Sequence, residues 1–207
     1  TTAKELPLID AAAACGCEYY VIDAGWYAPG EWWDSVGEWK ECRDRFPNGI
    51  KEVTDYIHKK GMVPGVWLEL EVMGINCEKA KKAPDDWFFV RHGKRVYDRS
   101  RYQLDFRNPA VIEHVNEVID RVVKEYGVGY IKMDYNIEPG IGTEIGAESV
   151  GQGLLEHEKA YLNWLDGVFA RYPDLVIENC SSGGLRMDYA LLSRYSIQST
   201  SEQEDYR

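Results

Sequence analysis

The sequence of 207 residues lacks the features that would place it in several large classes of protein. No apolar run approaches the roughly 20 residues that cross a bilayer, and no signal peptide is visible, so we expect no membrane partner. The formal net charge is −11, which argues against a nucleic-acid partner because such a partner needs a basic face. The five cysteines show no CxxC spacing, so neither a zinc site nor a disulfide framework is favoured. Reduced thiols instead predict a cytoplasmic location of the bacterial type.

Nucleotide-binding motifs are missing as well. The turn after the first predicted strand reads AGWYAPGEWW at 24–33, which is not GxGxxG. The glycine-rich stretches at 140–153 and 181–184 lack the Gly-Lys-Ser/Thr of a P-loop. These absences argue against a doubly wound nucleotide binder.

What the sequence does contain is a regular alternation of strand and helix patterns, without a Pro- or Ser-rich linker. Amphipathic patterns and end signals predict helices at 4–15, 50–60, 109–126, 154–172 and about 185–192. Strands are predicted at 18–26, 62–71, 102–106, 130–136, 175–180 and 196–199, with a hairpin around 92–94. Such alternation predicts parallel β/α units in one domain over residues 1–207.

Polar residues at the predicted strand ends favour a (β/α)₈ TIM-type barrel, because barrel active sites are built at the carboxyl ends of the strands. These residues are Asp23, Glu69, Glu71, Asp105, Asp134, Asn136, Glu178, Asn179 and Glu202. About six of eight strands are present, and 207 residues fall below the usual barrel size of about 250. We therefore expect an incomplete barrel that is a fragment of a longer multidomain protein.

The segment YIKMDYN at 130–136 carries the densest chemistry. Alternate side chains of a strand share a face, so Lys132, Asp134 and Asn136 should point the same way. One interpretation is glycoside hydrolysis by two carboxylates; a second is a divalent-metal enzyme with Asp23, Glu69, Asp134 and Glu178 as ligands and a lysine as base. A third is a buried Lys132–Asp134 pair that only neutralises itself.

Aromatic residues favour a sugar over a hydrated metal-phosphate site, because apolar sugar faces stack on aromatic rings. Five of the seven tryptophans lie on strand ends or in the loop after the first strand: Trp26, Trp32, Trp33, Trp39 and Trp67. Trp67 precedes Glu69 at a strand end and is the best single candidate, and Trp26 is also predicted to contact substrate.

Several motifs in a fixed order resemble the catalytic barrel of glycoside hydrolase family 36, the α-galactosidases or melibiases. They are DAGW at 23–26, FPNGI at 46–50, GVWLELE at 65–71, RSRYQLDF at 99–106, KMDYN at 132–136, ENCSSGGLRMD at 178–188 and STSEQED at 199–205. The resemblance implies a retaining double displacement on terminal α-linked sugars, without a metal or cofactor.

The same resemblance implies roles for individual residues. Asp134 would be the nucleophile, and Glu202, or else Asp205, the general acid/base. Lys132 would bind sugar hydroxyls beside the nucleophile. The other substrate contacts would be Asp23, Trp67, Arg99, Cys180 and Gly183, with Asn136 completing the rim. The partner would be an oligosaccharide or α-glycoside, and self-association would run through flanking domains outside this chain.

Two departures from the family motifs leave the identity of the sugar open. Ala24 stands where the family motif D-D-G-W has its second aspartate, and Glu202 stands where the acid/base is an aspartate. A lost charged hydrogen bond at Ala24 would cost roughly 1.5–3 kcal/mol in substrate binding. A non-catalytic sugar-binding relative and a transferase acting by the same chemistry are the remaining alternatives.

Overall fold

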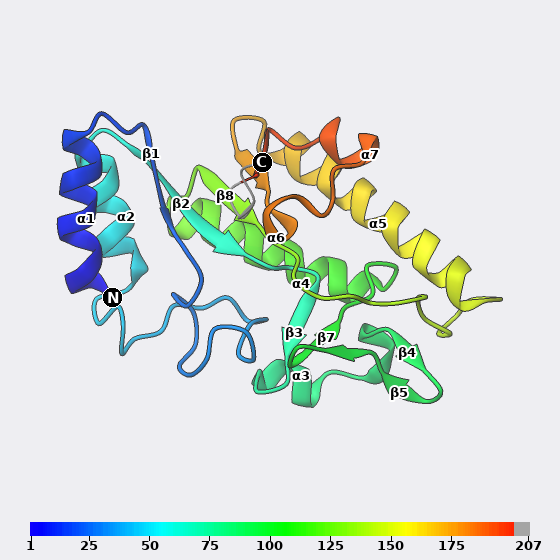
Figure 1. The fold of residues 1–207 in the computed structure, drawn as a ribbon. Helices are drawn as coiled ribbons and strands as arrows, with labels where there is room; N and C mark the ends of the chain where they lie inside the picture. Colours follow the sequence, from blue (N-terminus) through cyan, green and yellow to red (C-terminus); the bar gives the residue numbers. More distant parts are fainter. Residues whose placement is uncertain (201–207) are drawn as a thin grey trace, which may run out of the picture.

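A twisted sheet of five parallel strands forms the centre of the fold in the computed structural model, which describes residues 1–200 (Figure 1). The strands are β1 (Tyr19–Ile22), β2 (Val63–Leu68), β8 (Tyr130–Met133), β9 (Val176–Asn179) and β10 (Ile197–Gln198), and they pair in that order. Every pair is parallel, as the alternation of strand and helix predicts. Within the described residues, β1 and β10 are the two edges, so this part of the chain forms an open segment of a barrel wall.

Helices precede β1 and connect the strands that follow it, close to the predicted ranges. They are α1 (Thr2–Ala14), α2 (Ile50–Lys59), α4 (Pro109–Asp120) with a π-helical extension (Arg121–Glu125), and α5 (Val150–Arg171). Side chains cap two of them, since Asn108 accepts from the N–H of Ala110 and Ser149 from that of Gln152. None of the helices in residues 1–200 combines the length and the apolar character that crossing a bilayer requires.

The predicted strand at 102–106 is not a strand of the barrel sheet, and this prediction is wrong. Its first residues belong to β7 (Arg101–Gln103), which pairs antiparallel with β3 (Val72–Gly74) and β6 (Tyr97–Asp98) in a separate sheet. The N–H of Leu104 donates to the carbonyl of Glu71, at 2.8 Å, and β2 pairs directly with β8. Alternating hydrophobicity predicts a strand but not its partner or direction, so the sequence could not distinguish these sheets.

The remaining elements are short and lie beside the main sheet. A hairpin of β4 (Val90–Arg91) and β5 (Lys94–Arg95) confirms the turn predicted around 92–94. The others are α3 (Glu78–Lys82), a 3₁₀ turn (Asp85–Trp87), the one-turn α6 (Ser181–Gly184) and α7 (Tyr189–Leu192). Figure 1 shows β3, β7 and the β4–β5 hairpin grouped together, away from α1 and α2.

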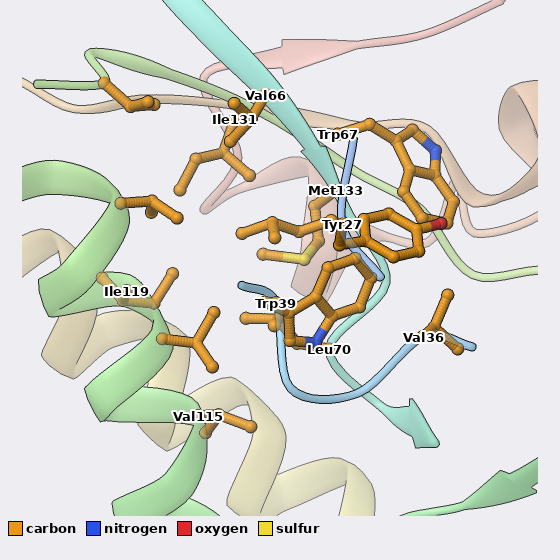
Figure 2. Close-up of a cluster of buried hydrophobic side chains, with 14 of the residues drawn as sticks. Tyr27, Val36, Trp39, Val66, Trp67, Leu70, Val115, Ile119, Ile131 and Met133 are labelled. Carbon is orange, nitrogen blue, oxygen red and sulfur yellow. The ribbon is translucent and has the colours of Figure 1, made fainter. Parts of the chain in front are cut away.

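A continuous apolar core fixes the ends of β2 and β8. Figure 2 shows Val66 and Ile131, which are register partners in the sheet, in the same cluster of buried side chains as Ile119 of α4. All three side chains are fully buried. Near the end of β2, the core continues into the rings of Trp67 and Tyr27, which stack with their centroids 5.9 Å apart. The residues that follow β2 and β8 are therefore held by packing on both sides.

Candidate active site

The main cavity of the described residues has a volume of about 650 Å³. It lies at the carboxyl ends of β1, β2 and β8, where barrel active sites are expected. Its lining comprises Asp23, Ala24, Trp32, Trp33, Trp67, Arg99, Ser100, Arg101, Lys132, Asp134, Asn136 and Ser182. The predicted common face of Lys132, Asp134 and Asn136 is thus confirmed, since all three line one cavity.

Asp134, just past the end of β8, is the most constrained group in the cavity. The residue is 7% exposed. Its Oδ1 accepts from two backbone N–H groups, those of Tyr135 and Ser182, each at 2.9 Å. Its Oδ2 accepts from the indole Nε1 of Trp67 at 3.0 Å. Oδ2 therefore keeps acceptor capacity that Oδ1 has already used, and it is the oxygen available to react.

These contacts also set the charge of Asp134. Burial opposes its ionisation, but the N–H of Ser182 and the neighbouring amide of Asn136 favour the carboxylate. Trp67 and the N–H of Tyr135 act in the same direction. The net result is a pKa below the ordinary value, so Asp134 is a carboxylate at neutral pH.

Lys132 pairs with Asp23 rather than with Asp134. Its Nζ lies 3.1 Å from Oδ2 of Asp23, which is at the end of β1. Burial disfavours the ammonium, but the charge of Asp23 and its hydrogen bond outweigh this and raise the pKa of Lys132. The third interpretation from the sequence, a self-neutralising Lys132–Asp134 pair, is therefore wrong. Asp23 is 61% exposed in its side chain, so this pair can accept or donate hydrogen bonds to a ligand.

Three tryptophans, Trp32, Trp33 and Trp67, form one wall of the cavity. The predicted role of Trp67 gains a second part, because its indole N–H also bonds Asp134. Trp26 does not line the cavity, which contradicts its prediction as a substrate contact. It is 1% exposed, and its Nε1 donates to the carbonyl of Trp67 at 2.9 Å, so it supports the wall from behind.

The other predicted substrate contacts divide into two groups. Arg99 lines the cavity, and its guanidinium donates to the carbonyl of Asn136 at 3.2 Å. Cys180 is fully buried, and neither it nor Gly183 is among the lining residues. Gly183 has a φ of 75°, which suits a glycine, and the neighbouring Ser182 makes the contact with Asp134 instead.

A buried ion pair that was not predicted from the sequence lies near Asp134. Arg101 and Glu69 are 2% and 0% exposed, and their Nε and Oε2 atoms lie 2.9 Å apart. Glu69 also accepts from the N–H of Asn136 at 2.7 Å. Burial, opposed by the charge of Arg101, raises the pKa of Glu69 to about 7. No local pattern marks Arg101, because Arg99 and the residue after it have positive φ angles of 45° and 63°, and the strand begins only at Arg101.

The carboxylates predicted as a ring, or as metal ligands, do not gather in one place. Glu178 accepts from the hydroxyl of Tyr130 at 2.5 Å and does not line the cavity. Glu71 pairs with Arg186, and Asp105 with Arg107 at 2.6 Å, both away from the lining. Among residues 1–200 no three His, Cys, Asp or Glu side chains are grouped to hold a metal ion. The four-ligand metal site predicted as an alternative therefore does not fit this donor set.

The predicted acid/base residues, Glu202 and Asp205, lie outside the described residues. Their assignment stays a prediction from the order of the motifs.

Comparisons with known proteins agree with this geometry. The Melibiase family model matches residues 2–206. The chain is 29% identical to the α-galactosidase Mel36A of Lactobacillus acidophilus over 87% of its length, and 31% identical to the α-galactosidase AgaA of Geobacillus stearothermophilus over 94%. It spans 25% and 27% of those two relatives, so it corresponds to about a quarter of the length of each.

Solved structures show the same fold. A variant of AgaA in complex with raffinose, a glycoside hydrolase family 36 α-galactosidase, superimposes with a TM-score of 0.88 at 26% identity. The match covers 99% of this chain and 29% of that chain. The fold predicted from the sequence, part of a TIM-type barrel, is confirmed by this similarity. With the family model matched over nearly every residue, the chain belongs to the Melibiase family.

Proposed function

We propose that this chain is part of the catalytic barrel of a longer retaining α-galactosidase, which hydrolyses terminal α-linked galactose by double displacement. The single observation that carries the proposal is Asp134, a buried carboxylate kept ionised by N–H donors at the strand ends of a sugar-sized cavity with a tryptophan wall. The relatives named α-galactosidase and the raffinose and stachyose complexes of AgaA support galactose as the sugar.

The reaction follows from the two oxygens of Asp134. With Oδ1 held by two N–H groups, Oδ2 forms a bond to the anomeric carbon while the bond to the leaving oxygen breaks. Glu202 or Asp205 gives its proton to that oxygen. Water then loses a proton to the same residue and attacks the anomeric carbon, which releases Asp134. A retaining mechanism requires the two carboxyl groups to be about 5–5.5 Å apart.

Lys132, Asp23 and Arg99 supply the charged hydrogen-bonding groups of the subsite. The Lys132–Asp23 pair presents both a donor and acceptors at the rim, so it can bind a hydroxyl through its proton and its lone pair. The tryptophan wall offers a flat apolar surface for one face of the sugar ring.

A panel of aryl α-glycosides tests the proposal with the full-length protein, alongside raffinose and stachyose. We expect turnover of the α-galactosides with retention of configuration, and a loss of at least about 10⁴-fold in Asp134→Ala. No turnover of any sugar by the intact protein would refute the enzyme assignment and would favour the sugar-binding alternative.

Azide separates the two candidates for the acid/base. A variant that lacks this residue should still cleave substrates with good leaving groups, and azide should then restore the second step with a galactosyl azide of retained configuration. Glu202→Ala and Asp205→Ala are compared, and only the true acid/base variant should give this product.

Two further expectations belong to the whole protein. We propose a cytoplasmic location, supported by Cys15, Cys17, Cys42 and Cys77, which form no disulfide. Self-association through segments outside this chain stays a prediction.

A further inference from the structure

The turn after β9 has an unusual backbone. Ser181, Ser182, Gly183 and Gly184 all have positive φ angles, of 45°, 51°, 75° and 127°. The left-handed region costs a residue with a Cβ about 1 kcal/mol or more, so two consecutive serines do not adopt it without external support. Ser182 uses this conformation to donate its N–H to Oδ1 of Asp134 and its hydroxyl to Oδ1 of Asn136, at 2.9 and 2.5 Å.

Arg186 fastens the far end of this turn to the sheet. Its Nη1 and Nη2 lie 2.5 and 3.0 Å from the two carboxylate oxygens of Glu71, just after β2. Its own carbonyl accepts from the side-chain amide of Asn179, at the end of β9, at 2.6 Å. Arg186 thus links Glu71, which follows β2, to Asn179, which ends β9. The strained turn at 181–184 lies between Asn179 and Arg186 in the sequence, so both of its ends are held.

The guanidinium of Arg186 also lies on the ring of Tyr135, 3.7 Å from the ring centroid. Tyr135 donates the other N–H to Oδ1 of Asp134, and its hydroxyl donates to Gln103 at 2.7 Å. Both backbone donors to the nucleophile therefore come from segments that Arg186 contacts: Tyr135 through the stacked ring, and Ser182 through the turn.

We propose that Arg186 is a positioning residue for the reaction, which holds the N–H groups of Tyr135 and Ser182 on Oδ1 of Asp134 and so leaves Oδ2 directed at the sugar. The inference rests on the proposed function. Arg186 does not line the cavity, so it would act through these two segments rather than by contact with the sugar.

The titratable and charged groups around Asp134 and around Arg186 determine how the reaction should depend on pH. Asp134 is influenced by the charges of Glu69 on one side and Lys132 on the other. The guanidinium of Arg186 interacts with Glu71, Tyr135, Glu158, Tyr161 and Tyr195, and Nε2 of His157 lies 3.3 Å from Oε2 of Glu71. Because Asp134 must be ionised to attack, weaker N–H donation should move the acid limb of kcat/KM to higher pH.

Two variants of the full-length protein test the proposal without leaving a lone buried charge. Arg186→Lys keeps a cation beside Glu71 but loses the planar stack, and Glu71→Gln with Arg186→Gln removes both charges together. In each we expect a 10- to 100-fold lower kcat/KM on an aryl α-galactoside and an acid limb about one pH unit higher. Circular dichroism and thermal unfolding establish that the variants are folded.

The matched control is Asp105→Asn with Arg107→Gln, which removes another partly buried Arg–carboxylate pair whose residues do not line the cavity. It should change thermal stability without moving the acid limb. Folded Arg186 variants whose acid limb coincides with that of the wild type would overturn the proposal.

A readout without turnover separates this inference from the proposed function. The probe is 1-deoxygalactonojirimycin, the ligand in one AgaA structure, whose ammonium should bind best to an ionised Asp134. Calorimetric affinity against pH should show the same one-unit displacement in both Arg186 variants. Binding without turnover in the wild type would refute the proposed function alone, whereas an unchanged pH dependence of binding in the variants would refute the role of Arg186.

Discussion

At the scale of single residues, the two oxygens of Asp134 have different surroundings. The backbone holds Oδ1 twice, whereas Oδ2 depends on one side chain, Trp67. A mutation can remove the side chain of Trp67 but not a backbone N–H, so a substitution at Trp67 is the most direct way to change the hydrogen bonding of Oδ2.

Trp67→Phe removes the indole N–H but keeps an aromatic ring against Tyr27. We expect kcat/KM to fall by about 10- to 100-fold, because a hydrogen bond to a charged group is lost. The matched control is Trp39→Phe, at a buried tryptophan 5.8 Å from the ring of Trp67 that does not line the cavity. Equal losses of activity in steady-state assays of the two variants would contradict this account.

Ala24 lies in the cavity lining next to Asp23. A carboxylate at this position could accept from a sugar hydroxyl, so Ala24→Asp should lower KM for aryl α-galactosides by about 10-fold or more. Competition between a galactoside and its 4-deoxy and 6-deoxy analogues measures the selectivity. If the variant gains nothing over the wild type with any of these sugars, the cavity does not place a hydroxyl near residue 24.

Glu69 should make the free energy of unfolding depend on pH. Burial raises its pKa to about 7 from the ordinary value of 4.5, so between these values the folded chain binds a proton that the unfolded chain has released. The contribution of Glu69 to the free energy of unfolding is fully present below pH 4.5 and is lost as the pH rises through 7. The stability of the wild type relative to Glu69→Gln should thus fall by about 3 kcal/mol from pH 4.5 to pH 8.

Denaturant titrations at the two pH values measure this difference, with Glu71→Gln as the control. Burial would raise the pKa of Glu71, but the charge of Arg186 and the hydrogen bonds of His157 and Arg186 lower it to about 2. The contribution of Glu71 should therefore stay constant between pH 4.5 and 8. If the stability difference between the wild type and Glu69→Gln is also the same at pH 4.5 and pH 8, the pKa of Glu69 is not raised.

At the scale of elements, close approach of three strands brings the catalytic groups together. A Cβ on Gly65 of β2 would lie 2.9 Å from Val21 of β1 and 3.1 Å from the Cβ of Tyr130 of β8. Gly65→Ala should separate these strands and destabilise the protein by about 1–3 kcal/mol. Gly167→Ala, on α5 with nothing within 4 Å, should instead stabilise it by about 0.5–1 kcal/mol in the same unfolding assay.

The elements also show which features the sequence could predict. Strand–helix alternation, glycine stops and the common face of Lys132, Asp134 and Asn136 depend on local periodicity, and the structure confirms them. The pairing of β3 with β7 joins residues about 30 positions apart, which periodicity does not encode. Short motifs that resemble those of the family identified Asp134 and Arg99 as candidate site residues. The ion pairs Arg101–Glu69 and Arg186–Glu71 join residues far apart in the sequence, so no local motif predicts them.

At the scale of the whole molecule, the described sheet is one open part of a barrel wall, and its relatives are about four times as long as this chain. Even so, the proposed nucleophile Asp134, its N–H donors, the Lys132–Asp23 pair and the tryptophan wall are all contained in residues 1–200. The proposed covalent step therefore involves residues 1–200, whereas the proposed protonation step involves Glu202 or Asp205.

The most direct test of the central claim is covalent labelling of the full-length protein. An activated fluorinated α-galactoside that forms the glycosyl-enzyme faster than it hydrolyses should add one sugar per active site, and mass spectrometry of the digested protein locates it. The account predicts the label on Asp134, and none in Asp134→Ala. A label on any other carboxylate, or release of product with inverted configuration and no labelled peptide, would contradict it.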